Sequence, residues 1–232
     1  PIEKTEETFG NYIDKYTMRQ AIKDGVTLEI VYEGRTHNAE VKDKAAMDEK
    51  FADVFSEYNL SERLQIIGYA TRDAYLEATE TIGDKAKDMV KHFVEQVFSN
   101  GFKAQIVTCS KEAADRYHKA IHLELQNIIT ELKANNPYDI EIDMLEKMKV
   151  EVVLSSGHND SPNIKLHGDS TKNKAKIASF KIPFGKEKDG VNGDVGILIV
   201  CEMLLTGFDA PIEQVMYLDK VIVAHNLLQA IA

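Results

Sequence analysis

The chain has 232 residues, enough for one large domain or two small ones, and 44% of them are hydrophobic, which is enough for a proper core. Its 28 lysine and arginine residues against 38 acidic residues give a formal net charge of −10. This balance argues against a protein that coats nucleic acid through its overall charge, although it allows a local track of phosphate contacts. We expect a soluble globular protein.

The two cysteines, Cys109 and Cys201, follow predicted buried strands and have no partners at metal-ligand spacing. Reduced thiols are therefore expected, rather than a disulfide or a zinc site. The histidines His158, His167 and His225 also lack ligand spacing, so no metal site is expected. No apolar run approaches the roughly 18 to 20 residues that cross a bilayer, and no signal peptide is visible at the N-terminus. These features predict a cytoplasmic protein without a membrane partner.

The first hundred residues consist of a polar segment followed by a segment whose apolar residues recur at helical spacing. Residues 1–43 are interpreted as a connecting arm with a short helix at 18–23, a turn at Asp24-Gly25 and a small β element at 26–35 and 39–41. Residues 44–97 carry apolar side chains at helical spacing, and Asn100-Gly101 supplies a stop, so 44–100 is predicted to be a helical region. Either these helices simply pack on a core, or they form a surface that contacts the rest of a larger subunit.

From residue 102 onward, strands and helices alternate. Four short apolar runs predict strands at 104–108, 150–154, 197–200 and 215–218. A helix is predicted at 111–133, with Ser110 as its N-cap. Strands that alternate with helices form parallel sheets. The expected fold class is therefore α/β, with a RecA-like parallel sheet flanked by helices and a mainly helical N-terminal part.

One basic region interrupts the acidic chain. Residues 163–190 contain seven lysines, and 185–193 is expected to be a flexible charged loop. Such a run is either a solvated face, the more common case, or a surface that faces DNA.

The catalytic motifs that the chain lacks also limit its function. There is no G-x-x-x-x-G-K-[ST] loop to cradle phosphates, and no strand ends in an acidic pair that would hold magnesium. Ser, His and Asp residues are too scattered for a hydrolase triad. We expect that this chain alone does not hydrolyse ATP.

Two phrases near the C-terminus carry a resemblance. The first is LLTGFDAP at 204–211, and the second, after a strand, is HNLLQAIA at 225–232. They resemble motifs V and VI of superfamily 2 helicases and translocases. Their sequences are most similar to the form that these motifs take in the motor (restriction) subunit of type I restriction-modification enzymes. That family continues motif VI into two arginines, and Pro1-Ile2-Glu3 resembles the end of its motif III phrase. The expectation is an excised piece, with 101–232 as the second RecA-like lobe, truncated within motif VI.

The resemblance implies roles for individual residues. Gly207 and Asp209 would face the nucleotide between two lobes, with Asp209 accepting hydrogen bonds from the ribose, and Gln229 would approach the γ-phosphate. From the local sequence alone, Asp209 is equally a turn or capping residue, and Gln229 a polar position on a helix. The candidates for contact with the DNA backbone are Ser110, Lys111, Ser156 and Thr206, although Ser110 is more simply an N-cap.

The resemblance also implies a function. The chain would be a fragment of the ATP-dependent DNA translocase and restriction endonuclease subunit, a type I site-specific deoxyribonuclease when intact. ATP and Mg2+ would be held mostly by the first lobe, and the partners would be double-stranded DNA and the methyltransferase and specificity subunits. The alternatives are a lobe of another superfamily 2 remodeller or helicase, and a non-catalytic α/β interaction module.

Overall fold

The computed structural model describes residues 18–25, 31, 33–34, 76–205 and 207–220. Most of the predicted arm and β element, the helical prediction for 44–75, and the candidates Thr206 and Gln229 lie outside these residues. The predicted short helix at 18–23 is confirmed as α2 (Met18–Lys23), and Gly25 follows it with a φ of 70° that glycine adopts without strain. The three described residues of the predicted strand at 26–35 are exposed and irregular.

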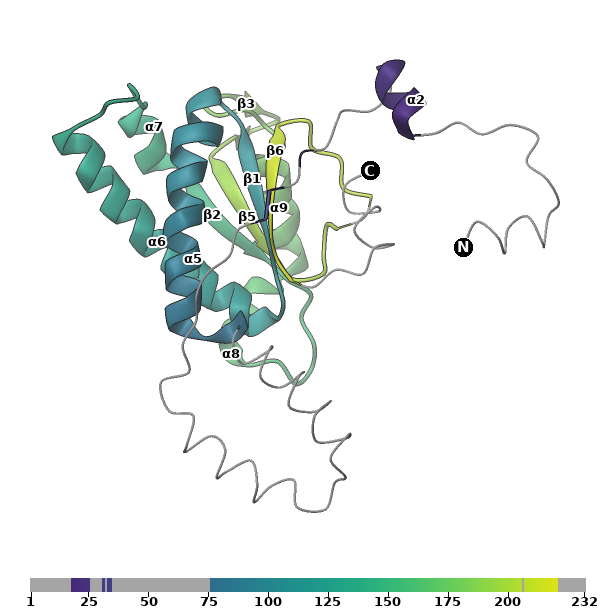
Figure 1. Ribbon diagram of the computed structural model, residues 1–232. Coiled ribbons are helices and arrows are strands. Elements are labelled where there is room, and N and C mark those ends of the chain that lie inside the picture. Colours follow the sequence, from purple (N-terminus) through teal and green to yellow (C-terminus); the bar gives the residue numbers. More distant parts are fainter. Residues whose placement is uncertain (1–17, 26–30, 32, 35–75, 206, 221–232) are drawn as a thin grey trace, which may run out of the picture.

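The predicted parallel sheet is confirmed. Its strands are β1 (Lys103–Thr108), β2 (Lys149–Val153), β5 (Val195–Val200) and β6 (Glu213–Asp219), in the spatial order β2-β5-β1-β6. All three neighbouring pairs are parallel. Every residue of β1 and β5 is buried, as expected for inner strands covered on both faces (Figure 1).

Helices cover the two faces of the sheet unequally. α5 (Thr79–His92) and α6 (Lys111–Ala134) lie side by side on one face, while α9 (Ser170–Phe180) covers the other (Figure 1). The α5 and α6 face forms the larger core, in which residues such as Ile82, Tyr117 and Ile199 are fully buried. α5 continues through a π turn (Phe93–Val97) and a 3-10 turn (Phe98–Asn100), and the chain reverses at Gly101 with a φ of 78°.

The region of the lysine run is more regular than predicted. The expected flexible loop at 185–193 is wrong, because residues Glu187–Lys188 (β3) and Val191–Asn192 (β4) form an antiparallel hairpin. Asp189 and Gly190 both have positive φ, at 51° and 76°, as the tight turn of a two-residue hairpin requires. Two further short helices, α7 (Ile142–Lys147) and α8 (Pro162–His167), were not predicted.

At the amino ends of the strands, two ionisable side chains lack an ion-pair partner among the described residues, although the charge of Asp194 acts on Lys103. The Lys103 Nζ donates to the carbonyls of Ser179, Ile182 and Gly193, at 3.2, 2.5 and 3.1 Å, and lies 4.7 Å from the centre of the Phe184 ring. Burial lowers the pKa of Lys103 to about 8 and raises that of Glu213, the first residue of β6, to about 7. Among the described residues neither forms an ion pair. At this edge Lys103 is fully buried and Glu213 is half-buried.

Candidate functional site

The carboxyl edge of the sheet gathers the loops that follow its strands, and ligands of open parallel sheets bind at this edge. At the end of β1, the Thr108 Oγ1 lies 3.1 Å from the carbonyl of Val200 on β5 and 2.8 Å from that of Ser110. Ser110 then begins α6 as its N-cap, because its Oγ accepts a hydrogen bond from the Ala113 N–H at 3.1 Å. The predicted capping role of Ser110 is confirmed.

Lys111 joins the loop after β1 to the loop after β2. Its Nζ donates to the Asp160 Oδ2 at 2.7 Å, and the Gly157 N–H donates to the same oxygen at 2.5 Å. The hydrogen bond from Lys111, followed by that from Gly157, lowers the pKa of Asp160, so this carboxyl is ionised at neutral pH. Two donors from different segments therefore converge on one anionic oxygen.

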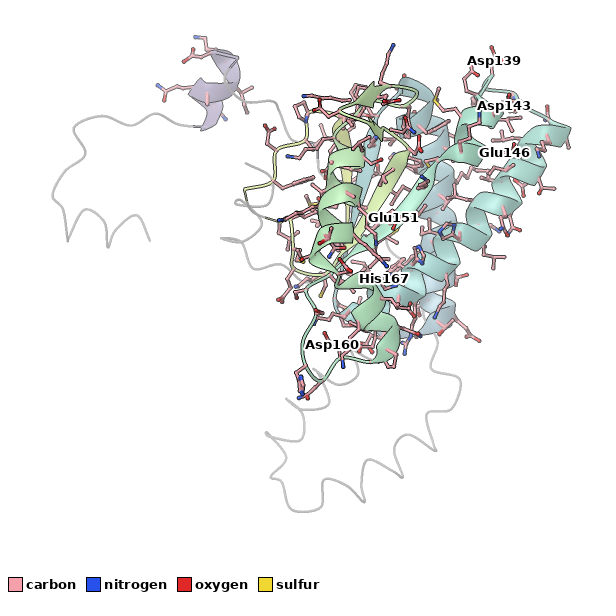
Figure 2. The ribbon with its side chains drawn as sticks, turned by 180° about the vertical axis from the view of Figure 1, so that it is seen from behind. Asp139, Asp143, Glu146, Glu151, Asp160 and His167 are labelled. Carbon is pink, nitrogen blue, oxygen red and sulfur yellow. The ribbon has the colours of Figure 1, made fainter. Side chains whose placement is uncertain are left out.

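The loop after β2 is fixed at its other end by α8. The Leu154 N–H donates to the His167 carbonyl at 3.3 Å, and a Cβ at Gly168 would overlap the side chain of Ser156. The His167 Nε2 also lies 3.5 Å from the Asp115 Oδ1 on α6. Asp160 lies at one end of the molecule in Figure 2, with His167 close by on α8, while Asp139, Asp143 and Glu146 lie at the opposite end. Contacts at both ends hold this loop against the start of α6.

The loop after β5 carries the motif V candidates. Gly207 has a φ of 66°, with open space where a Cβ would stand, so it serves as a turn position rather than a close-packing one. Phe208 anchors the loop to α9. The centre of its ring lies 6.1 Å from the centre of the Phe180 ring and 4.9 Å from the Lys181 Nζ. Asp209 is exposed and makes no hydrogen bond or ion pair with the described residues.

The carboxyl end of β6 is tied to both helices of the larger face. Asp219 is buried, and its two oxygens accept from the Lys85 Nζ on α5 at 2.5 Å and from the Tyr117 hydroxyl on α6 at 2.7 Å. Lys220 next to it donates to the Cys201 carbonyl, at 3.4 Å, and to Glu202, at 3.3 Å. Together with Thr108 and Lys111, these contacts connect the carboxyl ends of all four strands.

The two thiols at this edge are free and partly buried. Burial is the main cause that raises the pKa of each thiol, and the charges of Lys220 and, to a smaller extent, Lys111 act in the opposite direction on Cys201. Within residues 18–25 and the two long described stretches from 76 to 220, no group of three or more His, Cys, Asp or Glu side chains could hold a metal ion. No helix in the described part has an apolar stretch long enough to span a membrane.

The site predictions have mixed outcomes. Ser110, Lys111 and Ser156 lie on two loops that Lys111 and Asp160 join, and Gly207 and Asp209 lie on a third loop at the same edge. Their binding roles stay predictions, as do those of Thr206 and Gln229. The residues not predicted were Asp160 and the Asp219, Lys85 and Tyr117 cluster. The polar loop that contains Asp160 was visible in the sequence, but its long-range partner was not.

A parallel α/β sheet with polar loops gathered at its carboxyl edge defines a class of ligand-binding lobe, and sequence comparisons specify the family. The profile of the type I restriction enzyme subunit R domain 3 matches residues 100–232, more than half of the chain. The chain therefore belongs to this family. A second profile, that of the SWI2/SNF2 ATPase, matches residues 1–64.

Curated relatives extend over almost the whole chain. The type I restriction enzyme HindI endonuclease subunit of Haemophilus influenzae is 30% identical over 233 residues, covering 98% of this chain and 19% of the relative. Two endonuclease subunits of Methanocaldococcus jannaschii, of the type I restriction enzymes MjaIXP and MjaVIIP, are 28% and 30% identical over 97% and 95% of the chain, and over 19% and 21% of their own lengths. The chain thus spans about a fifth of the length of these relatives.

Proposed function

We propose that this chain is the second motor lobe of the DNA-translocating endonuclease subunit of a type I restriction enzyme. In this proposal it works in the cytoplasm with a first lobe, which supplies most of the site for ATP and Mg2+. The methyltransferase and specificity subunits and double-stranded DNA are the partners. The family match, together with relatives named as endonuclease subunits, supports this assignment.

The observation that carries the DNA-binding part is the junction of the loops after β1 and β2. Lys111 and the Gly157 N–H both point at one anionic oxygen, and Ser110 and Ser156 lie directly beside them in the chain. Lysine side chains and backbone N–H groups are the usual ligands of phosphate oxygens and carry no base specificity. A lobe that grips DNA here would bind any sequence, as movement along a duplex requires.

The nucleotide part is supported by the geometry of the loop after β5. Asp209, directly beyond the turn at Gly207, is exposed and has no partner among the described residues, which suits its carboxylate to accept hydrogen bonds from ribose hydroxyls. Bound between the two lobes, ATP with its magnesium ion would supply the contacts that favour closure and the phosphoryl transfer after which the lobes reopen. The role of this chain is to complete the nucleotide site and to hold DNA as the lobes close.

The test is DNA-stimulated ATP hydrolysis by the intact endonuclease subunit, with Asp209→Ala compared with Asp143→Asn. Asp143 is exposed on α7, at the far end of the lobe from Asp160 (Figure 2), so its variant controls for loss of one negative charge. We expect at least about a tenfold loss of stimulated kcat/KM in Asp209→Ala, because a contact made to the bound nucleotide is removed. Equal activities in the two variants would show that Asp209 is only a turn residue.

A further inference from the structure

The ion pair between Lys111 and Asp160 raises a question about the proposed DNA contact. The Asp160 Oδ2 occupies the point on which the Lys111 Nζ, at 2.7 Å, and the Gly157 N–H, at 2.5 Å, converge. A phosphate oxygen would use the same two donors. The anion-binding point that would grip DNA is thus already filled by a carboxylate of the chain itself.

The environment of this ion pair favours replacement of one partner by another anion or by water. The side chains of Lys111 and Asp160 keep 28% and 20% of their surface exposed, so water reaches both. A partly exposed ion pair is weak, because solvent replaces each partner readily. The buried pair of Lys85 and Asp219 at the same edge is only 9% and 8% exposed and has no such freedom.

We propose that Asp160 is an internal competitor for the DNA backbone: its carboxylate occupies the phosphate point formed by Lys111 and Gly157, and it yields that point when DNA binds. The inference rests on the proposed function, since it concerns the same DNA contact. Because Lys111 exchanges one anion for another, neither state leaves its charge without a partner. The exchange keeps the grip weak, as suits a motor that must release each phosphate in order to move on.

The nearby charges are consistent with exchange. After the hydrogen bonds from Lys111 and Gly157, the charge of Lys165 on α8 also lowers the pKa of Asp160, so the field at this carboxylate comes from more than one cation. Asp160 lies on the loop after β2, which is fixed at both ends, whereas Lys111 extends from the first turn of α6 on a long flexible stem. Rotation of the Asp160 side chain can therefore free both donors, and the flexible Lys111 side chain can adjust to the incoming phosphate, while both loops stay in place.

The experiment measures binding of the intact endonuclease subunit to a fluorescent linear duplex by anisotropy, at several salt concentrations. The variants are Asp160→Asn, Lys111→Ala and the double variant, with Asp143→Asn and Lys147→Ala on α7 as charge-matched controls. Asn keeps the shape of the side chain but binds a cation weakly. Thermal melts followed by circular dichroism confirm that each variant is folded.

We expect Asp160→Asn to tighten binding by about threefold to tenfold and Lys111→Ala to weaken it by a similar factor. The logarithmic salt slope of Asp160→Asn should become steeper by up to about 0.9, because one phosphate is neutralised without a carboxylate being set free. In the Lys111→Ala background, Asp160→Asn should have no more effect than Asp143→Asn.

Other outcomes separate the two proposals. If Asp160→Asn weakens binding as Lys111→Ala does, Asp160 positions the lysine; the competitor role is then wrong and the DNA contact stands. If Asp160→Asn and Asp143→Asn tighten binding equally, only net charge matters and the competitor role is again wrong. If Lys111→Ala matches Lys147→Ala, or no variant binds DNA, the DNA contact at this loop fails and the competitor role fails with it.

Discussion

The two edges of the sheet treat ionisable side chains in opposite ways. At the carboxyl edge, Lys85, Lys111 and Lys220 each lie against a carboxylate, within 2.5 to 3.3 Å. At the amino edge, Lys103 is enclosed by three carbonyls, and Glu213 has no ion-pair partner among the described residues. The pKa of Lys103 is lowered and that of Glu213 is raised, so that both shifts favour the neutral form of the side chain. The more exposed pairs of the carboxyl edge, those of Lys111 and Lys220, can exchange partners with solvent, whereas Lys103 and Glu213 have no ion-pair partner to exchange in the described part of the chain. This difference favours the proposal that binding occurs at the carboxyl edge.

The largest effect should come from breaking the buried pair of the carboxyl edge. Asp219→Asn removes the carboxylate that lies 2.5 Å from the buried Lys85 ammonium, and we expect the free energy of unfolding to fall by about 3 kcal/mol in urea denaturation. The double variant with Lys85→Met should recover part of this loss, because it also removes the buried positive charge. A loss of less than about 0.5 kcal/mol, as expected for the exposed control Asp143→Asn, would contradict the importance of pairing.

The next effect tests the lysine of the amino edge. Lys103→Met keeps the apolar stem between the aromatic rings but leaves the carbonyls of Ser179, Ile182 and Gly193 without this donor. We expect a loss of about 2 kcal/mol in the same unfolding measurement, because buried carbonyls then lack a hydrogen bond. A variant as stable as the wild type would show that removal of the buried charge offsets those bonds.

Glu213 makes the comparison dependent on pH. Its pKa is raised from 4.5 to about 7 by burial, so the folded chain holds this proton more tightly than the unfolded chain does. Stability therefore falls as the pH rises from 4.5 to about 7, and Glu213→Gln should remove that fall. We expect the variant to be more stable than the wild type by about 1 to 3 kcal/mol at pH 8, with a difference that becomes smaller toward pH 4. If the free energies of unfolding of the two proteins changed in parallel with pH, the raised pKa of Glu213 would be contradicted.

The smallest effect lies between the edges, on the central strand. Gln105 in β1 is fully buried, and its amide has no hydrogen-bond partner in the described part of the chain. Gln105→Leu should stabilise the protein by about 1 kcal/mol, since an unsatisfied amide is replaced by an apolar side chain of similar size. A lower melting temperature would instead reveal that the amide has a partner.

The sequence predicted the sheet well, because each strand contains a short apolar run, and the inner strands β1 and β5 are buried along their whole length. It missed the β3 and β4 hairpin because its turn signal, Asp189-Gly190, lies within a charged stretch that looked like an open loop. The carboxyl edge was predictable as a place, since loops after parallel strands must gather there. Its contacts were not, because Lys111 and Asp160 are 49 residues apart and Lys85 and Asp219 are 134 apart, and no local pattern encodes either pair.

The strand order also has a consequence for how the chain is made. β1 is the first strand of the described sheet to leave the ribosome, yet its two neighbours are β5 and β6. Ala104 can therefore pair with Ile197 and Val215 only after these later residues have been synthesised. Until then its backbone N–H and carbonyl groups have no native strand to pair with, and contacts between such distant segments form slowly. Unpaired strand edges invite aggregation in folding intermediates. A nascent chain of this kind should therefore depend on chaperones, and on a pace of synthesis that delivers β5 and β6 before β1 finds another partner.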